Sequence, residues 1–319
     1  MMLISVCMPL FNGERYLASA LDSVLKQSYP SVEIIVVDDG STDASSTVLQ
    51  DYVSRVRILK QANKGAAAAR NAAWLASRGD LIMFMDADDI IGPDHIQALV
   101  EKVSNERSIA SAPWARFYND PNEAQFTEDY IENDVSGVEW CTTSMANGAP
   151  MTASGMFLLP RRMLEEFGGW NERLSLIDDF EFYTRIIARA NMVRFAPGAR
   201  LYYRSGIPGS LSRRKNRRAV ESQFLSLMLG TGHLLKAVDN THTRRACANV
   251  LQAFEYEHYP NNSDLRAKIS ARVSHLGGAD IIPSGPPGFH KLRPWVGWKA
   301  ARHVQRAAER LGLNGIARR

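Results

Sequence analysis

Short apolar runs alternate with segments of helical periodicity through the first half of the chain. The apolar runs predict strands at residues 3–8, 33–37, 56–59 and 81–85. Between them, the spacing of apolar residues predicts a helix around residues 17–25, a second from about Ala44 and an alanine-rich third at 66–77. Pro9 is expected to end the first strand. Strands that alternate with helices in this way favour a parallel sheet with helices on its faces.

The second half of the chain has a less regular pattern. Residues 114–150 mix acidic and aromatic side chains, and we interpret them as a variable excursion beside the sheet. One interpretation is that this segment faces the acceptor. Beyond them, the pattern predicts a strand at 154–159, helices at 161–167 and after Asp178-Asp179, a helical region at 219–282 and a Pro/Gly-rich linker at 283–288. We therefore predict a main α/β domain at residues 1–215, a helical extension at 216–282 and a linker with a final helix at 283–319.

Acidic residues follow two of the predicted strands at the points where the strands end. Asp38 and Asp39 come after the second strand, and Asp86 opens the sequence Asp-Ala-Asp-Asp after the fourth. Ligands of open parallel sheets bind beyond the carboxyl ends of the strands, so both clusters are expected at the edge where a site would form.

The turn that begins at Asp86 is a candidate metal site. Three carboxylates on a short turn concentrate negative charge, and Mg²⁺ is commonly held by one or two carboxylates together with substrate phosphates. The alternative is a helix start at Gly92-Pro93 that collects acids near its positive end. The sequence pattern alone leaves both interpretations open.

Three other polar residues have one chemical and one structural interpretation each. Asp39 can accept a hydrogen bond from a uracil imide or a ribose hydroxyl, or it can belong to a capped turn. Arg70 can bind a phosphate or pair with an acid. Asp179 can act as a general base, or it can cap a helix in which Glu181 and Arg185 form a surface pair.

Charge is distributed unevenly along the chain, and the composition narrows the class of protein. Residues 286–319 carry eight basic residues against Glu309 alone. From Trp295, apolar residues and cations fall on separate helical faces, which suits either an anionic membrane surface or packing on the main domain. No recognition motif for nucleic acid accompanies this charge. Three scattered cysteines and the absence of a signal peptide or a long apolar run lead us to expect a cytoplasmic protein, with peripheral contact at the inner face of the membrane as one alternative.

Several motifs in order along residues 3–212 together resemble glycosyltransferase family 2. These motifs are Met8-Pro9-Leu10-Phe11-Asn12-Gly13, Val37-Asp38-Asp39-Gly40-Ser41-Thr42-Asp43, Gly65 with Arg70-Asn71, Asp86-Ala87-Asp88-Asp89, Phe167-Gly168-Gly169-Trp170-Asn171, Asp178-Asp179 and Ser210-Leu211-Ser212. The resemblance implies an α/β, Rossmann-like, mostly parallel sheet flanked by helices, known as the A-type glycosyltransferase fold. The helical C-terminal region would be an extension of it.

The resemblance also implies roles for individual residues. Pro9, Phe11 and Asp39 would help to hold a nucleotide, and Asp86 would contact its ribose or the sugar. Asp88 would bind Mg²⁺ or Mn²⁺, and Asp179 matches the catalytic base of the family. One position departs from the pattern, because members often carry a histidine shortly after a Tyr-Arg pair and the residues after Tyr203-Arg204 contain none. Water is the expected substitute ligand.

We therefore predict an inverting, metal-dependent transferase that moves one sugar from a nucleotide-sugar to an acceptor hydroxyl, in cell-surface polysaccharide or glycolipid synthesis. A UDP-sugar donor is favoured, and the acceptor would be a glycan or a lipid-linked molecule. The processive synthases of the family have a Gln-x-x-Arg-Trp signature and membrane spans, and this sequence has neither. A non-catalytic scaffold of the same fold and a nucleotidyltransferase are the alternatives, and association with copies of itself is left open.

Overall fold

The computed structural model describes residues 1–127, 131–207 and 216–310, which form two compact units. The first unit comprises Met1–Ser144 and Pro150–Thr243, and the second comprises Met145–Ala149 and Arg244–Arg319. The predicted motif at 210–212, the predicted boundary at 215 and the last residues of the predicted final helix, from 311 on, lie outside the described residues.

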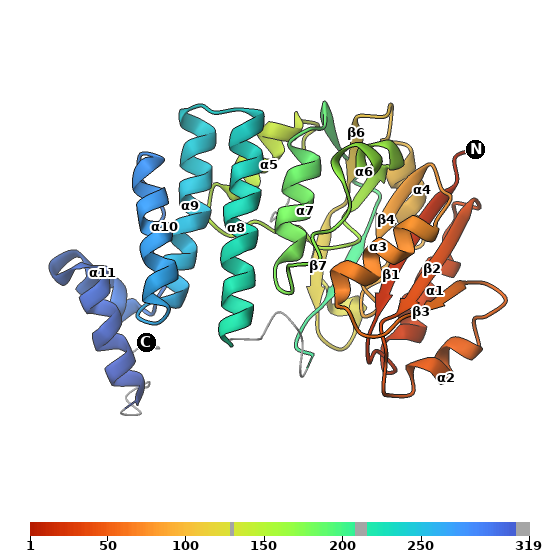
Figure 1. Cartoon of the computed structure of the whole chain (residues 1–319), viewed down its shortest axis with the longest axis horizontal. Coiled ribbons are helices and arrows are strands. Elements are labelled where there is room, and N and C mark those ends of the chain that lie inside the picture. The colour runs from red at the N-terminus through yellow and green to blue at the C-terminus, as the bar shows by residue number, and fades with distance from the viewer. Residues whose placement is uncertain (128–130, 208–215, 311–319) are drawn as a thin grey trace. The chain divides into compact units, whose positions relative to one another are not determined.

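A seven-stranded, mostly parallel sheet forms the centre of the first unit. Its strand order is β3-β2-β1-β4-β8-β6-β9 (Figure 1). The strands are β1 (Ile4–Leu10), β2 (Val32–Asp38), β3 (Arg57–Lys60), β4 (Leu81–Phe84), β6 (Ser108–Ser111), β8 (Phe157–Pro160) and β9 (Met192–Phe195). Strand β8 runs antiparallel to both of its neighbours, and the other paired strands of this sheet are parallel. The predicted fold class is therefore confirmed.

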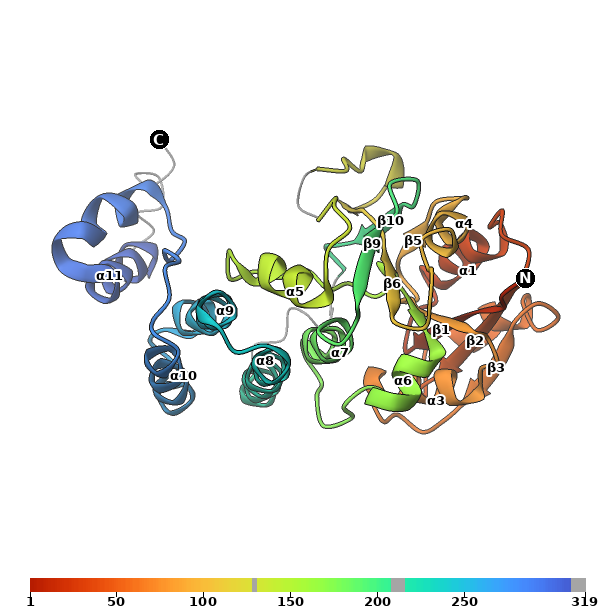
Figure 2. The same ribbon diagram turned by 90° about the horizontal axis from the view of Figure 1, so that it is seen from above.

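Helices cover both faces of this sheet. Helices α1 and α4 lie on one face, and α3 and α6 lie on the other (Figure 2). The helices of the first unit are α1 (Leu17–Leu25), α2 (Ser45–Gln50), α3 (Ala66–Ala76), α4 (His95–Val100), α5 (Gly137–Met145), α6 (Arg161–Phe167), α7 (Asp178–Ile187) and α8 (Arg217–Ala237), with a short 3₁₀ helix at Pro121–Glu123. Side chains of β1, β2 and β4 are almost all buried, because both faces of these strands are covered.

A second, three-stranded sheet stands beside the first. It pairs β5 (Ile90–Ile91), β10 (Leu201–Arg204) and β7 (Trp114–Phe117), with β10 in the middle. Residues 114–150 therefore contain a strand and a helix, where the sequence predicts an irregular excursion. Because β5 begins just after the acidic turn at Asp86, the small sheet connects that turn to β10.

Strand β1 continues through Pro9 to Leu10, so the prediction that Pro9 ends it is wrong. Pairing with β4 stops at Cys7, while pairing with β2 extends to Leu10 and Asp38. The backbone of Pro9 faces the β4 side, beyond the last paired residue. The missing N–H group of Pro9 therefore costs no hydrogen bond between strands.

Helix α8 packs with the first unit, against α7 and the segment before it. The Ser222 hydroxyl accepts hydrogen bonds from the backbone N–H groups of Ser175 (2.8 Å) and Leu176 (2.9 Å). Gly230 lies so close to Phe180 that an added Cβ would approach the ring to 2.5 Å. The first compact unit consequently extends to Thr243, beyond the predicted domain of residues 1–215.

The second unit is helical. It contains most of α9 (Thr241–His258), together with α10 (Ser263–His275) and α11 (Pro287–Arg310). Helix α11 begins eight residues before the predicted start at Trp295, with Pro287 at the first helical position, where its missing N–H costs nothing. Gly297 interrupts the helix with φ 77° and ψ 158°. Residues on either side of Gly297 therefore do not share the single helical face that the sequence predicts.

Candidate active site

The topology brings the sequence-predicted carboxylates to one edge of the sheet. Strands β2 and β4 pair in parallel with β1 on either side, so Asp39 and Asp86 emerge at the carboxyl ends of two strands that flank β1. Pro9 and Phe11 lie at the end of β1 between them, and the side chain of Phe11 is 48% exposed. This is the edge at which open α/β sheets bind their ligands.

Arg70 on α3 joins the acidic turn to the start of α7. Its Nη2 lies 2.7 Å from Asp86 Oδ1, and its Nη1 lies 2.9 Å from Asp178 Oδ2. The guanidinium also stacks over Trp170, at 4.3 Å from the ring. Burial opposes the charge, but the two carboxylates outweigh burial and raise the pKa of Arg70 above its usual value. Of the two interpretations of Arg70, the structure displays acid pairing, and a phosphate contact stays a prediction.

The acidic turn itself is held by Arg204 at the end of β10. The backbone N–H of Arg204 donates to Asp89 Oδ1 at 2.8 Å, and its Nε donates to the carbonyl oxygen of Asp88 at 2.8 Å. Asp89 is buried, and its Oδ2 has no hydrogen-bond partner among the described residues. Burial, and then the neighbouring carboxylates Asp88 and Asp86, raise the pKa of Asp89 well above its usual value.

Asp88 has the properties expected of a cation ligand. Burial and the nearby charge of Asp86 raise the pKa of Asp88 to about 7, against the opposing charges of Arg204 and Arg70. Among the described residues, no three His, Cys, Asp or Glu side chains converge in a cluster that could hold a metal ion by themselves. Asp86 and Asp88 nevertheless fit the Mg²⁺ sites in which one or two carboxylates are completed by phosphate oxygens and water. Metal binding at Asp88 stays a prediction.

Asp179 is the second residue of α7, next to the residue that Arg70 binds. Its Oδ1 accepts the N–H of Phe180 at 2.9 Å, and its Oδ2 lies 3.3 Å from the Thr152 hydroxyl. Ile177, not Asp179, occupies the N-cap position, so the simple capping interpretation does not describe Asp179. Burial, followed by the charge of Asp178, raises the pKa of Asp179 to about 7. A carboxyl group with a pKa near the working pH is suited to proton transfer.

Asp39 organises the loop that leads into α3. Its Oδ1 accepts hydrogen bonds from Lys64 N (2.8 Å) and Gln61 Nε2 (2.7 Å), and its Oδ2 accepts one from Gly65 N (2.8 Å). A carboxylate has about four acceptor positions, so these three bonds leave room for one more partner. The predicted nucleotide contact of Asp39 remains compatible with this geometry and stays a prediction.

The sequence pattern does not single out Arg204 or Thr152 as parts of the site. Arg204 reaches Asp89 across 115 positions of the chain, and Thr152 reaches Asp179 across 27. Neither contact follows from a local motif. The one available signal is the Tyr203-Arg204 pair itself, and in the structure its arginine bonds to the acidic turn.

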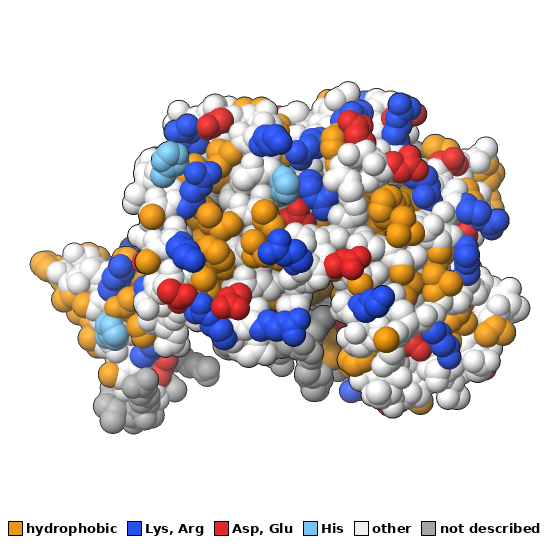
Figure 3. Space-filling model, viewed as in Figure 1, with side chains coloured by type: hydrophobic (Ala, Val, Ile, Leu, Met, Phe, Trp, Pro, Cys, Tyr) orange, Lys and Arg blue, Asp and Glu red, His pale blue; other side chains and the backbone are white. Residues whose placement is uncertain are grey.

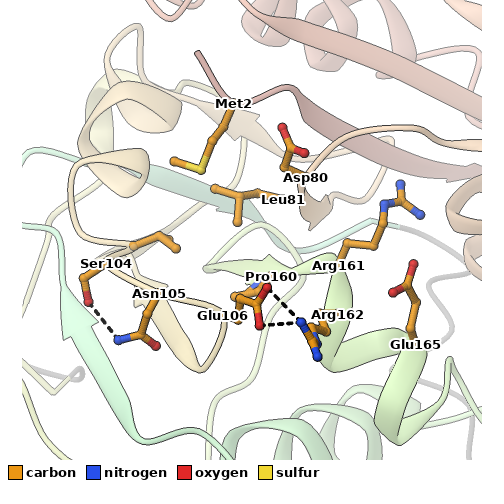
Figure 4. Close-up of a pocket in the computed structure, with 11 residues that line it drawn as sticks. Met2, Asp80, Leu81, Ser104, Asn105, Glu106, Pro160, Arg161, Arg162 and Glu165 are labelled. Carbon is orange, nitrogen blue, oxygen red and sulfur yellow. Dashed lines mark hydrogen bonds and ion pairs between the residues drawn. The ribbon is translucent and has the colours of Figure 1, made fainter.

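A separate pocket of about 490 Å³ lies at the opposite edge of the sheet (Figure 4). Met2, Asp80 and Leu81 line it at the amino ends of β1 and β4, and Arg162 forms an ion pair with Glu106 across its wall at 2.8 Å. None of the predicted site residues lines this pocket. The candidate site is therefore the carboxyl edge, not this pocket.

Known proteins resemble this chain in sequence and in structure. The glycosyltransferase GlyG of Streptococcus pneumoniae is 36% identical over 149 residues, which cover 45% of this chain and 47% of GlyG. Chondroitin synthase of Escherichia coli is 27% identical over 187 residues, or 58% of this chain and 26% of that protein. The aligned region thus spans about half or less of these relatives. A structure of S. aureus TarS 1–349 in complex with UDP-GlcNAc has a TM-score of 0.69 at 17% identity and covers 98% of this chain and 92% of TarS 1–349.

The family assignment rests on the part of the chain that builds the sheet and its carboxyl edge. The TarS likeness supports the fold, and no helix within the described ranges combines the length and apolar character needed to span a bilayer. The model of the family described as glycosyl transferase family 2 matches residues 5–168, which include most of β1, the Asp38-Asp39 pair, Arg70 and the turn at Asp86. With more than half of the chain matched, the protein belongs to glycosyltransferase family 2.

Proposed function

We propose that this protein is an inverting, divalent-metal-dependent glycosyltransferase that moves a single sugar from a nucleotide-sugar to an acceptor hydroxyl. The observation that carries the proposal is the double ion pair of Arg70. It holds the strand-end carboxylate Asp86 and the start of α7 together. Asp179, whose pKa is raised to about 7, follows Asp178 directly, which supports a general base at this edge of the sheet.

Each predicted site residue has its own role in the reaction. Pro9, Phe11 and Asp39 hold the nucleotide at the ends of β1 and β2. Asp179 takes the proton from the acceptor hydroxyl while that oxygen attacks the anomeric carbon, and the bond to the nucleoside diphosphate breaks on the opposite face. When bound at Asp88, Mg²⁺ or Mn²⁺ would neutralise charge on the departing diphosphate. The products are the glycosylated acceptor and the free nucleoside diphosphate, with the configuration inverted.

A UDP-sugar is the favoured donor. The TarS structures that share this fold contain UDP or UDP-GlcNAc, and Asp39 retains one acceptor position that suits a uracil imide or a ribose hydroxyl. Chondroitin synthase among the relatives supports a role in making cell-surface polysaccharide or glycolipid. We propose a glycan or a lipid-linked molecule as the acceptor.

The test is release of the nucleoside diphosphate from a panel of UDP-, GDP- and dTDP-sugars, with Mg²⁺, with Mn²⁺ and with a chelator. Native protein is compared with Asp88→Ala, Asp179→Asn and the control Asp94→Asn. Asp94 is exposed, and its side chain forms no cap hydrogen bond. We expect metal-dependent release from one class of donor, retained in Asp94→Asn and lost in the other two variants.

The competing function is a nucleotide-binding scaffold without turnover. Two observations favour the scaffold. The described residues contain no three-residue metal cluster, and the sequence lacks the expected histidine after Arg204. Equilibrium binding of UDP separates the two functions. Binding without release under any metal condition would support the scaffold and reject the transferase.

A further inference from the structure

Trp295 stands out as an exposed aromatic side chain at the bend of α11. Its side chain is 87% exposed. Trp298, three residues later, packs instead against Tyr256 and Tyr259, with ring centroids at 4.8 and 5.0 Å. The second unit thus has internal contacts for one tryptophan of this pair and presents the other to solvent.

The break at Gly297 explains the difference between the two tryptophans. Its positive φ turns the chain between the two arms of α11, whose bend is visible in Figures 1 and 2. The arm after the break is oriented by Trp298 and by a 2.7 Å hydrogen bond between His303 and Tyr259. Trp295 lies before the break and does not contact Tyr256 or Tyr259.

Other apolar side chains are exposed in the same region. Val296 and Val304 are 47% and 55% exposed, while Ala301 is buried. Val296 and Val304 are therefore not packed within the second unit, whereas Ala301 is. Hydrophobic side chains gather at the left edge of the view in Figure 3, over the bend of α11, with Lys and Arg side chains beside them.

Cations lie close in sequence to the exposed apolar residues. Lys291 and Arg293 precede Trp295 by four and two residues. Within the described part of the chain, neither forms an ion pair. Lys299 lies 3.4 Å from Glu255 but keeps more than half of its side chain exposed. From 287 to 310 the sequence carries six lysines and arginines against Glu309 alone. The region therefore combines positive charge with an exposed indole ring.

We propose that this bend of α11, defined by Lys291, Arg293, Trp295 and Val296, docks on an anionic lipid bilayer. Tryptophan side chains favour the boundary between headgroups and acyl chains, and basic residues are attracted to acidic headgroups. A second copy of the chain would bring like charges together at the same surface, which disfavours self-association. The proposal is independent of the transferase activity, because it rests on residues of the second unit alone.

Co-sedimentation of the full chain with vesicles tests the proposal. Vesicles of phosphatidylcholine alone are compared with vesicles that also contain phosphatidylglycerol, at low and high salt. We expect binding to the anionic vesicles only, weakened by salt. Lys291→Glu with Arg293→Glu should reduce partitioning by at least an order of magnitude, because each cation near an anionic surface contributes roughly a fivefold effect.

Trp295→Ala tests the apolar part of the surface, with Leu75→Ala as its matched control. Leu75 is 73% exposed on α3 of the first unit, so its removal should leave vesicle binding unchanged. We expect Trp295→Ala to lose most of the binding while donor hydrolysis without vesicles stays at the native level. Equal binding to neutral and anionic vesicles, or undiminished binding by Trp295→Ala, would overturn the proposal. So would a concentration-dependent dimer that forms without lipid and is abolished by Trp295→Ala.

Discussion

Arg70 is the residue on which the electrostatics of the site depend. It is buried, and it pairs with two partly exposed carboxylates, Asp86 and Asp178, that come from different parts of the chain. Removal of one partner from a buried ion pair leaves the other charges without compensation, which costs more than the pair itself contributes. Arg70 therefore supports both the geometry and the stability of the site.

We expect Arg70→Ala to lower the free energy of unfolding by about 3–5 kcal/mol, the range found when a buried pair is broken. Urea denaturation followed by circular dichroism measures this change. The control is Arg78→Ala, because Arg78 is 81% exposed at its side chain and lies 3.7 Å from Glu33. That exposed pair should contribute less than ~1 kcal/mol. Equal losses in both variants would contradict the structural role assigned to Arg70.

The raised pKa of Asp179 predicts how the rate depends on pH. A general base must be deprotonated, so turnover should rise as pH increases through about 7 and level off above it. The charges that act on Asp179 are those of Asp178 and Asp86, which raise its pKa, and of Arg70, which lowers it. Asp179→Asn should reduce turnover by about 10²–10⁴-fold. Initial rates of glycosyl transfer from pH 5.5 to 8.5, at saturating donor, provide the measurement. A rate that falls through this range would exclude Asp179 as the base.

The same shift predicts an effect on stability with the opposite dependence. The pKa of Asp179 is higher in the folded state than in the unfolded chain, so the folded state binds more protons between the two values. Stability contributed by Asp179 is present at low pH and is lost as pH rises through about 7. We expect Asp179→Asn to lose less thermal stability than the native protein between pH 5 and pH 8. Identical pH dependence of the two melting temperatures would indicate that Asp179 is not protonated at pH 5.

At the scale of elements, helix α7 connects the site to the rest of the first unit. Arg185 in its last turn donates to the carbonyl oxygens of Phe167, Gly168 and Gly169 at 2.6–2.9 Å. The same guanidinium pairs with Glu181, which also contacts His233 of α8 at 3.0 Å. The Glu181–Arg185 pair is therefore buried, where the sequence predicts a surface pair. These contacts hold the helix whose first turn carries Asp179.

Two glycines of α8 provide a direct test of its packing on α7. A Cβ at Gly230 would meet the Phe180 ring at 2.5 Å, whereas a Cβ at Gly232 has no neighbour within 4 Å. We expect Gly230→Ala to destabilise the protein by about 1–3 kcal/mol through overpacking. Gly232→Ala should stabilise it by about 0.5–1 kcal/mol, because alanine is the better helix former. Urea unfolding of both variants measures the difference, and two stabilising substitutions would show that α8 does not pack as described.

At the scale of the whole molecule, local patterns predicted the core of the sheet and the acidic clusters at its edge. Strands β1, β2 and β4 are buried on both faces and read as continuous apolar runs, and the acids follow directly where β2 and β4 end. The small sheet could not be predicted in this way. Its strands β5, β7 and β10 have two to four residues and pair across large separations in sequence, so neither length nor alternation identifies them.

Local sequence patterns also could not predict the tertiary contacts around the site. The bonds from Arg204 to the acidic turn depend on β10, and the bonds from Asp39 to the Gln61–Gly65 loop depend on how that loop folds back. The orientation of α11 depends on the single break at Gly297. Sequence thus predicts which side chains reach the edge of the sheet, and tertiary packing decides which partners they meet there.

Ligand binding should be visible in the stability of the whole chain. A ligand that binds the folded state alone raises the free energy of unfolding by about 2.7 kcal/mol at one hundred times its dissociation constant, which corresponds to a rise in melting temperature of roughly 5–10 °C for a unit of this size. We expect UDP with Mn²⁺ to produce such a rise, and UDP with a chelator to produce a smaller one, because Arg204 and Arg70 offset the charge of Asp88 only in part. Asp88→Ala should abolish the difference between the two conditions, while Asp94→Asn should preserve it. Differential scanning fluorimetry measures all of these shifts, and an equal rise with metal and with chelator in the native protein would show that nucleotide binds without a cation at the acidic turn.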